Sequence, residues 1–133
     1  MRITADTNII VRAVVGDDPA QTAAAEKILE SATQIVVSLP CLCEIAWVLR
    51  RVYSFDDTAI AATIQTLINT RNVVMNRPAA EAGLALLVAG GDFADGVLVY
   101  EGASLGAEVF VSFDRRAVKR LADLGFKTMM PGV

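Results

Sequence analysis

The chain has 133 residues, of which 54% are hydrophobic, and its formal net charge is −3. This length suits one domain with a real core, the composition excludes a disordered chain, and the negative charge argues against a protein that coats nucleic acid by bulk electrostatics. No apolar run reaches the roughly 18 residues that span a bilayer, and no signal-peptide region opens the sequence, so we expect a cytoplasmic protein without a membrane partner.

Histidine is absent from the sequence. Its absence excludes serine–histidine hydrolases, histidine zinc sites and ribonucleases that transfer protons through paired imidazoles. Cys41 and Cys43 are the only cysteines, and their spacing within an apolar run is typical of reduced core thiols. Any catalysis must therefore use carboxylates, hydroxyls, Lys, Arg or a metal held by oxygen ligands.

Strands alternate with helices along the whole chain. Short strands are predicted over residues 3–5, 34–38, 73–75, 108–112 and 126–129. Helices are predicted from residue 9, over 20–31, from 40, over 58–69, over 78–88, from 97 to 105 and over 117–124. This alternation predicts a parallel, doubly wound α/β sheet within a single domain.

Glu44 interrupts an otherwise apolar helical run, Leu39 to Leu49. A carboxylate in such a helix is expected to be partly buried. An unpaired buried charge costs roughly several kcal/mol, so the carboxylate needs a cation nearby or must stay neutral. The alternative is a solvent-facing Glu44, or one paired with Arg50 or Arg51.

Three aspartates lie at the starts of predicted helices. Asp6 and Asp114 directly follow strands, whereas Asp95 lies at the start of an apolar helix, and each has an ordinary explanation as a helix cap. In a parallel sheet, however, these points and the start of the Glu44 helix fall on one edge. Four carboxylates there would repel one another without a divalent cation, and oxygen ligands suit Mg²⁺ or Mn²⁺.

A metal site of this kind cuts phosphodiesters by activating water and neutralising charge on phosphorus. Next to Asp114 lies a basic run whose Arg115, Arg116 and Lys119 are candidates for holding the flanking phosphates of RNA. The alternative is a solvated helix face in which Lys119 pairs with Asp123.

Together these residues resemble the PIN-domain ribonucleases, and most closely the VapC-type toxins of bacterial toxin–antitoxin pairs. The resemblance rests on the ordered set Asp6-Thr7-Asn8, Glu44 in an apolar helix, Phe93-Ala94-Asp95, and Val109-Phe110-Val111-Ser112-Phe113-Asp114-Arg115. It covers residues 1–133 as a single PIN domain. It implies a three-layer α/β/α sandwich with a central parallel sheet of four or five strands, and Mg²⁺- or Mn²⁺-dependent endoribonuclease activity.

The resemblance also assigns roles to particular residues. The catalytic, metal-binding quartet would be Asp6, Glu44, Asp95 and Asp114. An accessory acid and supporting hydrogen-bond groups would be Asp92, Thr7, Asn8 and Ser112. Gly96 stands where relatives usually have Ala, which should loosen the helix start slightly without removing a ligand.

The resemblance further implies a homodimer and a small VapB-type antitoxin as partners, beside the RNA substrate. A rival interpretation is a catalytically idle PIN-like binding module that acts through a protein or RNA partner. A phosphoacceptor receiver domain is a third possibility, but it requires paired acids after the first strand and a lysine after a late strand, and neither is in place here.

Overall fold

The computed structural model describes residues 1–132 and divides into two compact units. The N-terminal unit is Met1–Asn76, and the C-terminal unit begins at Arg77. None of the helices within residues 1–132 combines the length and the apolar character needed to cross a membrane.

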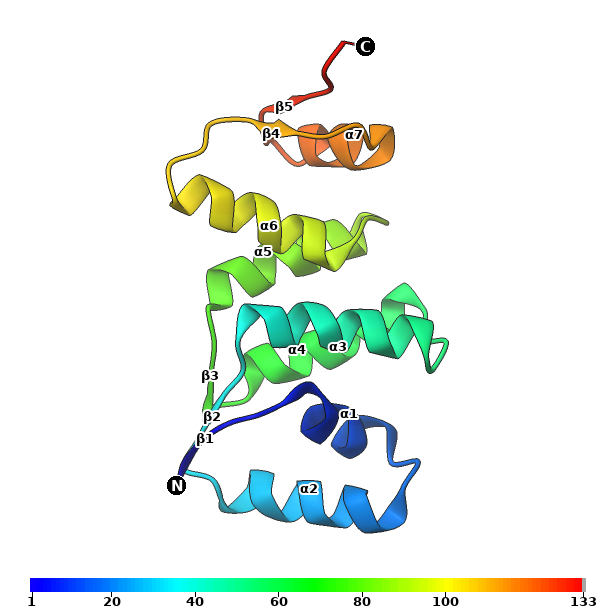
Figure 1. Cartoon of the computed structure of the whole chain (residues 1–133), viewed down its shortest axis with the longest axis vertical. Helices are drawn as coiled ribbons and strands as arrows, with labels where there is room; N and C mark the ends of the chain where they lie inside the picture. The colour runs from blue at the N-terminus through cyan, green and yellow to red at the C-terminus, as the bar shows by residue number, and fades with distance from the viewer. Residues whose placement is uncertain (133) are drawn as a thin grey trace. The chain divides into compact units, whose positions relative to one another are not determined.

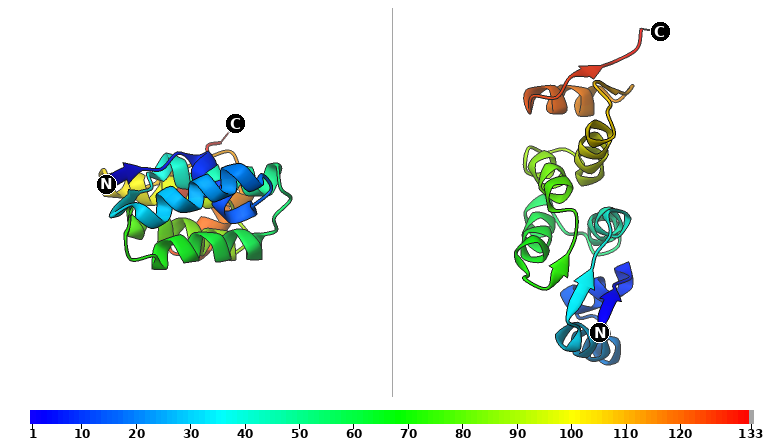
Figure 2. Two further views of the ribbon diagram at one scale, coloured as in Figure 1. Left: turned by 90° about the horizontal axis from the view of Figure 1, so that it is seen from below. Right: turned by 90° about the vertical axis from the view of Figure 1, so that its left-hand side faces the viewer.

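The N-terminal unit contains three strands and four helices (Figure 1). In chain order they are β1 Arg2–Thr4, α1 Thr7–Val15, α2 Pro19–Ser31, β2 Gln34–Val36, α3 Leu39–Arg51, α4 Asp57–Asn69 and β3 Val73–Val74. The three strands pair in parallel in the order β1-β2-β3, and their arrows point the same way in the right-hand view of Figure 2. Every connection between neighbouring strands is therefore a crossover that includes helices.

Strand β1 lies at the edge of this three-stranded sheet. Arg2 and Thr4 are exposed, and only Ile3 is half-buried. The prediction of a buried first strand over residues 3–5 is therefore wrong in its burial and shifted by one residue. Ala5 itself is buried just beyond the strand, where its N–H donates to the Val36 carbonyl at 3.0 Å.

The C-terminal unit contains two strands and three helices, and its strands β4 and β5 also pair in parallel. In chain order the elements are α5 Arg77–Val88, α6 Phe93–Ser104, β4 Phe110–Val111, α7 Arg115–Asp123 and β5 Thr128–Met129. Leu86, Val99 and Leu121 form a buried cluster against which Phe110 and Phe126 pack. The α/β class and the parallel pairing of strands are thus confirmed. Within residues 1–132, however, the strands form one three-stranded and one two-stranded sheet, not the single sheet of four or five strands that the resemblance implies, and β2 to β5 are each shorter than the sequence predicts.

Helices α5 and α6 run antiparallel and lie side by side in Figure 1. At Gly96 a Cβ atom would lie 2.6 Å from the Ala82 carbonyl oxygen and 2.7 Å from the Gly83 Cα. The two backbones approach this closely because neither glycine carries a side chain. Gly96 is therefore a packing position, a role that goes beyond the expected slight loosening of the helix start.

Aspartates cap five of the seven helices of residues 1–132. The N-caps of α1, α2, α4, α6 and α7 are Asp6, Asp18, Asp56, Asp92 and Asp114. Each accepts a hydrogen bond from an N–H of the first turn, which is the ordinary stabilising role of a capping carboxylate. The capping interpretation of Asp6, Asp92 and Asp114 is thus confirmed. Each cap uses only Oδ1, which leaves Oδ2 available to bind a ligand.

Candidate functional site

Asp6 lies at the junction where β1 gives way to α1. Its Oδ1 accepts a hydrogen bond of 2.7 Å from the Thr7 N–H, and the side chain is exposed. No residue within 1–132 donates a hydrogen bond to its Oδ2. Asp6 therefore both caps the helix and presents a carboxylate oxygen to solvent or to a ligand.

Cys41 holds the backbone on both sides of Asp6. The buried Thr7 donates from Oγ1 to Cys41 Sγ at 3.6 Å, and this thiol donates in turn to the Ala5 carbonyl oxygen at 3.6 Å. Burial raises the pKa of the Cys41 thiol above its ordinary value, and the negative charges of Asp6 and Glu44 raise it further against the opposing effect of the Thr7 hydrogen bond. Both carboxylates therefore lie close enough to Cys41 to be felt electrostatically.

Glu44 follows Cys41 by three residues on α3, a spacing that places both side chains on one side of the helix. The buried face of this helix is formed by Leu42, Ile45 and Leu49. Glu44 is exposed, so the expectation of partial burial is wrong. Among residues 1–132 it pairs with neither Arg50, which forms an ion pair with Asp57, nor Arg51, so the alternative of a solvent-facing Glu44 is the one confirmed.

Asp6 and Glu44 line the same pocket, which has a volume of about 300 Å³. Thr7 and Asn8, both expected to support the acids, also line it. The remaining wall comes from residues that the sequence did not single out, namely Val11, Arg12, Val48, Val52 and Tyr53. The pocket is thus lined by two acids together with an arginine, a tyrosine and valines.

In the C-terminal unit, Asp95 lies near two other aspartates. It occupies the first turn of α6 and is half-buried. Burial raises the pKa of the Asp95 carboxyl above its ordinary value, and the negative charges of Asp92 and Asp114 raise it further. The unit therefore brings three carboxylates close enough for their charges to interact, and the Asp95 carboxyl holds its proton more tightly than an isolated aspartate would.

Ser112 and Asp114 form a small turn at the carboxyl end of β4. The Ser112 Oγ accepts a hydrogen bond of 2.9 Å from the Asp114 N–H. Asp114 Oδ1 accepts from the N–H groups of Arg116 and Ala117 at 3.0 and 3.1 Å. The serine thus fixes the backbone at Asp114, and the aspartate caps α7.

The basic residues after Asp114 lie on the exposed surface of α7. Arg115 and Arg116 are exposed and form no ion pair with any residue in 1–132. Lys119 pairs with Asp123 at 3.4 Å, as the alternative interpretation of this run predicts, but both side chains are largely exposed. Such a pair contributes little to stability and opens readily to a phosphate.

The acids fit a hard divalent cation in their chemistry. All the candidate donors are carboxylate oxygens, which Mg²⁺ and Mn²⁺ prefer, and the repulsion on Asp95 is of the kind that a cation relieves. Within residues 1–132, however, no three side chains among Asp, Glu and Cys are grouped closely enough to hold a metal ion. Charge repulsion between carboxylates acts over longer distances than metal coordination. The raised pKa of Asp95 is therefore compatible with the absence of a three-ligand group among these residues.

Comparison with known proteins gives one match. No curated protein and no solved structure matches the chain. A family model described as "PIN domain" matches residues 3–124, a span that includes Asp6, Glu44, Asp95 and Asp114. Members of this family are generally nucleases that use divalent metal ions. Because the match covers most of the sequence, the chain belongs to the PIN domain family.

Proposed function

We propose that the protein is an Mg²⁺- or Mn²⁺-dependent endoribonuclease that acts as the toxin of a VapBC-type pair. Membership of the PIN family supports a nuclease. The observation that carries the proposal furthest is the half-buried Asp95 beside Asp92 and Asp114. Burial, and then the negative charges of the other two acids, raise the pKa of its carboxyl, and a bound divalent cation would relieve that repulsion. The absence of histidine agrees with a reaction that needs no imidazole.

In this proposal the residues have distinct roles. Asp6, Glu44, Asp95 and Asp114 are the catalytic and metal-binding acids of a single domain over residues 1–133, and Asp92 is an accessory acid. When bound, the cation would lower the pKa of water and neutralise charge on the scissile phosphate. The supporting groups are Thr7, which fixes the backbone at Asp6, Ser112, which fixes it at Asp114, and Asn8 beside Asp6.

The exposed cations after Asp114 have a role in binding. Arg115, Arg116 and Lys119 hold RNA phosphates on either side of the scissile bond. These contacts carry no sequence information, so they position the strand without choosing it. The proposal also includes a homodimer, a VapB-type antitoxin as the inhibitory partner, and a cytoplasmic location where the RNA target is met.

The proposal is tested by incubating the purified chain with cellular RNA in Mg²⁺, in Mn²⁺ and in EDTA. We expect discrete fragments with 5′-phosphate ends only when a metal is present. Asp6→Asn and Asp95→Asn should abolish cleavage and keep the circular dichroism of the unmutated chain. Glu26→Gln is the matched control, because it neutralises an exposed helical acid outside the site.

Retained cleavage in both Asp6→Asn and Asp95→Asn would contradict the proposal. Metal binding without cleavage of any RNA would favour the idle binding module instead. The toxin role is tested separately by expressing the chain in bacteria, where growth arrest should depend on Asp6 and be relieved by a cognate antitoxin. Size-exclusion chromatography coupled to light scattering would test the homodimer.

A further inference from the structure

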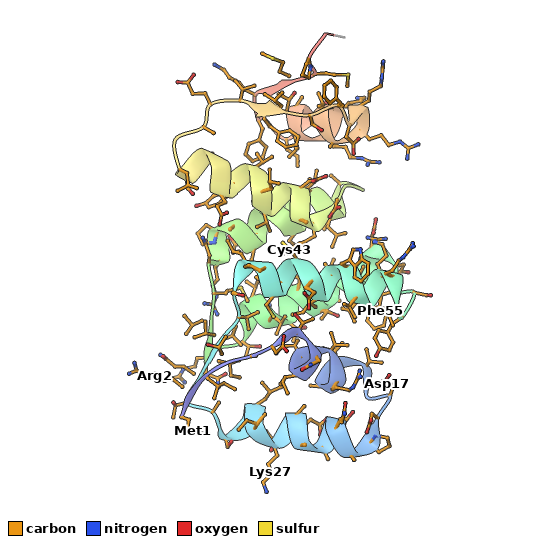
Figure 3. The ribbon with its side chains drawn as sticks, in the orientation of Figure 1. Met1, Arg2, Asp17, Lys27, Cys43 and Phe55 are labelled. Atoms are coloured by element: carbon orange, nitrogen blue, oxygen red, sulfur yellow. The ribbon has the colours of Figure 1, made fainter. Side chains whose placement is uncertain are left out.

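Arg12 lies on α1 and lines the same pocket as Asp6 and Glu44, and its guanidinium is held in one orientation by three neighbours. Nε donates to Gln21 Oε1 at 2.7 Å, and Nη1 donates to the Tyr53 hydroxyl at 2.9 Å and lies 3.5 Å from Asp17 Oδ1. The Tyr53 hydroxyl donates to Asp17 Oδ2 at 2.9 Å. Asp17, labelled in Figure 3, lies where α1 leads into α2.

One nitrogen of this guanidinium, Nη2, has no hydrogen-bond partner among residues 1–132, although the Arg12 side chain is only 29% exposed. An arginine that merely linked α1, α2 and Tyr53 would need only the contacts already made. The remaining donor is therefore preorganised for a ligand, since its orientation is already fixed before binding.

Arg12 also separates two hollows of the surface. It lines the pocket that contains Asp6 and Glu44, and it lines a second pocket of about 450 Å³ with Gln21, Ala24 and Ala25. Asn8, one turn earlier on α1, lines both pockets as well. An extended RNA strand that leaves the acids can thus pass along Asn8 and Arg12 from one pocket into the other.

The size and lining of the acidic pocket decide what kind of ligand it takes. Its volume of about 300 Å³ is at the lower end of the range for small-molecule sites, which suits one nucleoside. Val11, Val48 and Val52 offer apolar walls to a base, and Tyr53 adds an aromatic one. Unpaired RNA bases are commonly bound in this way, between aromatic or apolar side chains and an arginine donor.

We propose that this pocket binds the unpaired base and ribose of the nucleotide next to the scissile phosphate, with Arg12 Nη2 as the hydrogen-bond donor to the base. The inference rests on the proposed ribonuclease function and names a specificity site for it. A base with an acceptor facing Nη2 is favoured over one without. Arg12 and Tyr53 thereby select the cleavage site, whereas the cations of α7 only hold the strand.

The experiment fills the pocket without disturbing the core. Val52 is the C-cap of α3 and is 61% exposed, so Val52→Trp should fold normally and occupy the space of a base. Val88 ends α5 and is 73% exposed outside the pocket, which makes Val88→Trp the matched control. Binding of fluorescein-labelled random RNA octamers is measured in Ca²⁺, and kcat and KM for the mapped cleavage site are measured in Mg²⁺.

We expect Val52→Trp to raise Kd and KM by about tenfold or more, since base–aromatic contacts contribute strongly per base, and Val88→Trp to change neither. Arg12→Lys keeps the positive charge but loses the planar guanidinium with its fixed donor directions. It should therefore weaken discrimination among bases at the cleavage site more than it weakens overall affinity for RNA. An RNA with an abasic site at the adjoining nucleotide should bind the unmutated chain and Val52→Trp equally, because the two changes remove the same contact.

Equal RNA binding by Val52→Trp and Val88→Trp would overturn the inference and leave the pocket to another occupant, such as an antitoxin side chain. If the unmutated chain cleaves RNA in that case, the proposed function stands without this subsite. If Val52→Trp weakens RNA binding but neither the unmutated chain nor any variant cleaves RNA, the pocket stands as an RNA base-binding site, and both the ribonuclease proposal and the role of the pocket in selecting a cleavage site fail. Failure of the unmutated chain to bind RNA would overturn both.

Discussion

The Thr7 hydroxyl donates a hydrogen bond to the Cys41 thiol across 3.6 Å, and this contact joins the start of α1 to α3. The same thiol donates to the Ala5 carbonyl oxygen, so one side chain forms hydrogen bonds with the residues on both sides of Asp6. Glu44 follows on the next turn of α3. The relative position of the two acids of this pocket therefore depends on a cysteine that carries no charge of its own.

Replacing Cys41 by Val should lower both stability and activity. Val fills a similar volume but leaves the buried Thr7 hydroxyl without a partner, at a cost of about 1–3 kcal/mol. Urea denaturation of Cys41→Val and of the double variant Cys41→Val/Thr7→Val measures this cost. The double variant should recover most of the stability, since both partners are then apolar, whereas RNA cleavage should stay low in both. Additive losses of stability would show that the contact contributes nothing.

Asp95→Asn should make the fold more stable at neutral pH in the absence of metal. The raised pKa of Asp95 means that the folded chain holds this proton more tightly than the unfolded chain does. Stability from this group is therefore fully present below the ordinary value of 3.8 and is lost as pH rises through the folded pKa. Asn cannot ionise, so the variant does not lose this stability as the pH rises.

Thermal denaturation between pH 4 and pH 8 in EDTA checks this prediction. The Tm of the unmutated chain should fall relative to that of Asp95→Asn as pH rises, and Mg²⁺ should narrow the difference by stabilising only the unmutated chain. A Tm difference that is constant with pH would show that Asp95 is not under strain. Glu26→Gln again provides the control for simple loss of a negative charge.

Gly96→Ala should destabilise the C-terminal unit by about 1–3 kcal/mol, the usual cost of overpacking, because its Cβ would meet the α5 backbone. Gly102 in the same helix provides the control. A Cβ at Gly102 would meet only the Ala107 Cβ at 3.9 Å, so Gly102→Ala should be neutral or stabilising by up to about 1 kcal/mol through helix propensity. Chemical denaturation followed by circular dichroism compares the two, and equal effects would refute the close approach of α5 and α6.

Removing two cations from α7 should weaken RNA binding without changing where RNA is cut. Arg115→Ala/Arg116→Ala should reduce the slope of log Kd against log salt by roughly one to two units, as expected for the loss of two phosphate contacts. Lys27→Ala is the control, because Lys27 projects outward from α2 (Figure 3). Fluorescence anisotropy at several salt concentrations provides the measurement, and an unchanged slope would remove these arginines from the RNA-binding surface.

The sequence alone was sufficient for the local features of the fold. Helix caps at Asp6, Asp92 and Asp114 follow from short-range hydrogen bonding, which depends only on neighbouring residues. The alternation of strands and helices likewise predicted the α/β class and the parallel pairing. The family match over residues 3–124 agrees with the ordered set of acids and motifs found in the sequence.

Burial and partnership were decided only by the tertiary structure. Glu44 was expected to be partly buried because its helix is apolar, yet the rotation of α3 directs Leu42, Ile45 and Leu49 inward and leaves Glu44 exposed. The roles of Cys41, Arg12 and Gly96 could not be predicted from the sequence, because each depends on a residue distant along the chain or on the approach of another helix. Local hydrogen bonding and hydrophobic periodicity depend on residues that are close together in the sequence, whereas the face that a helix buries depends on what packs against it.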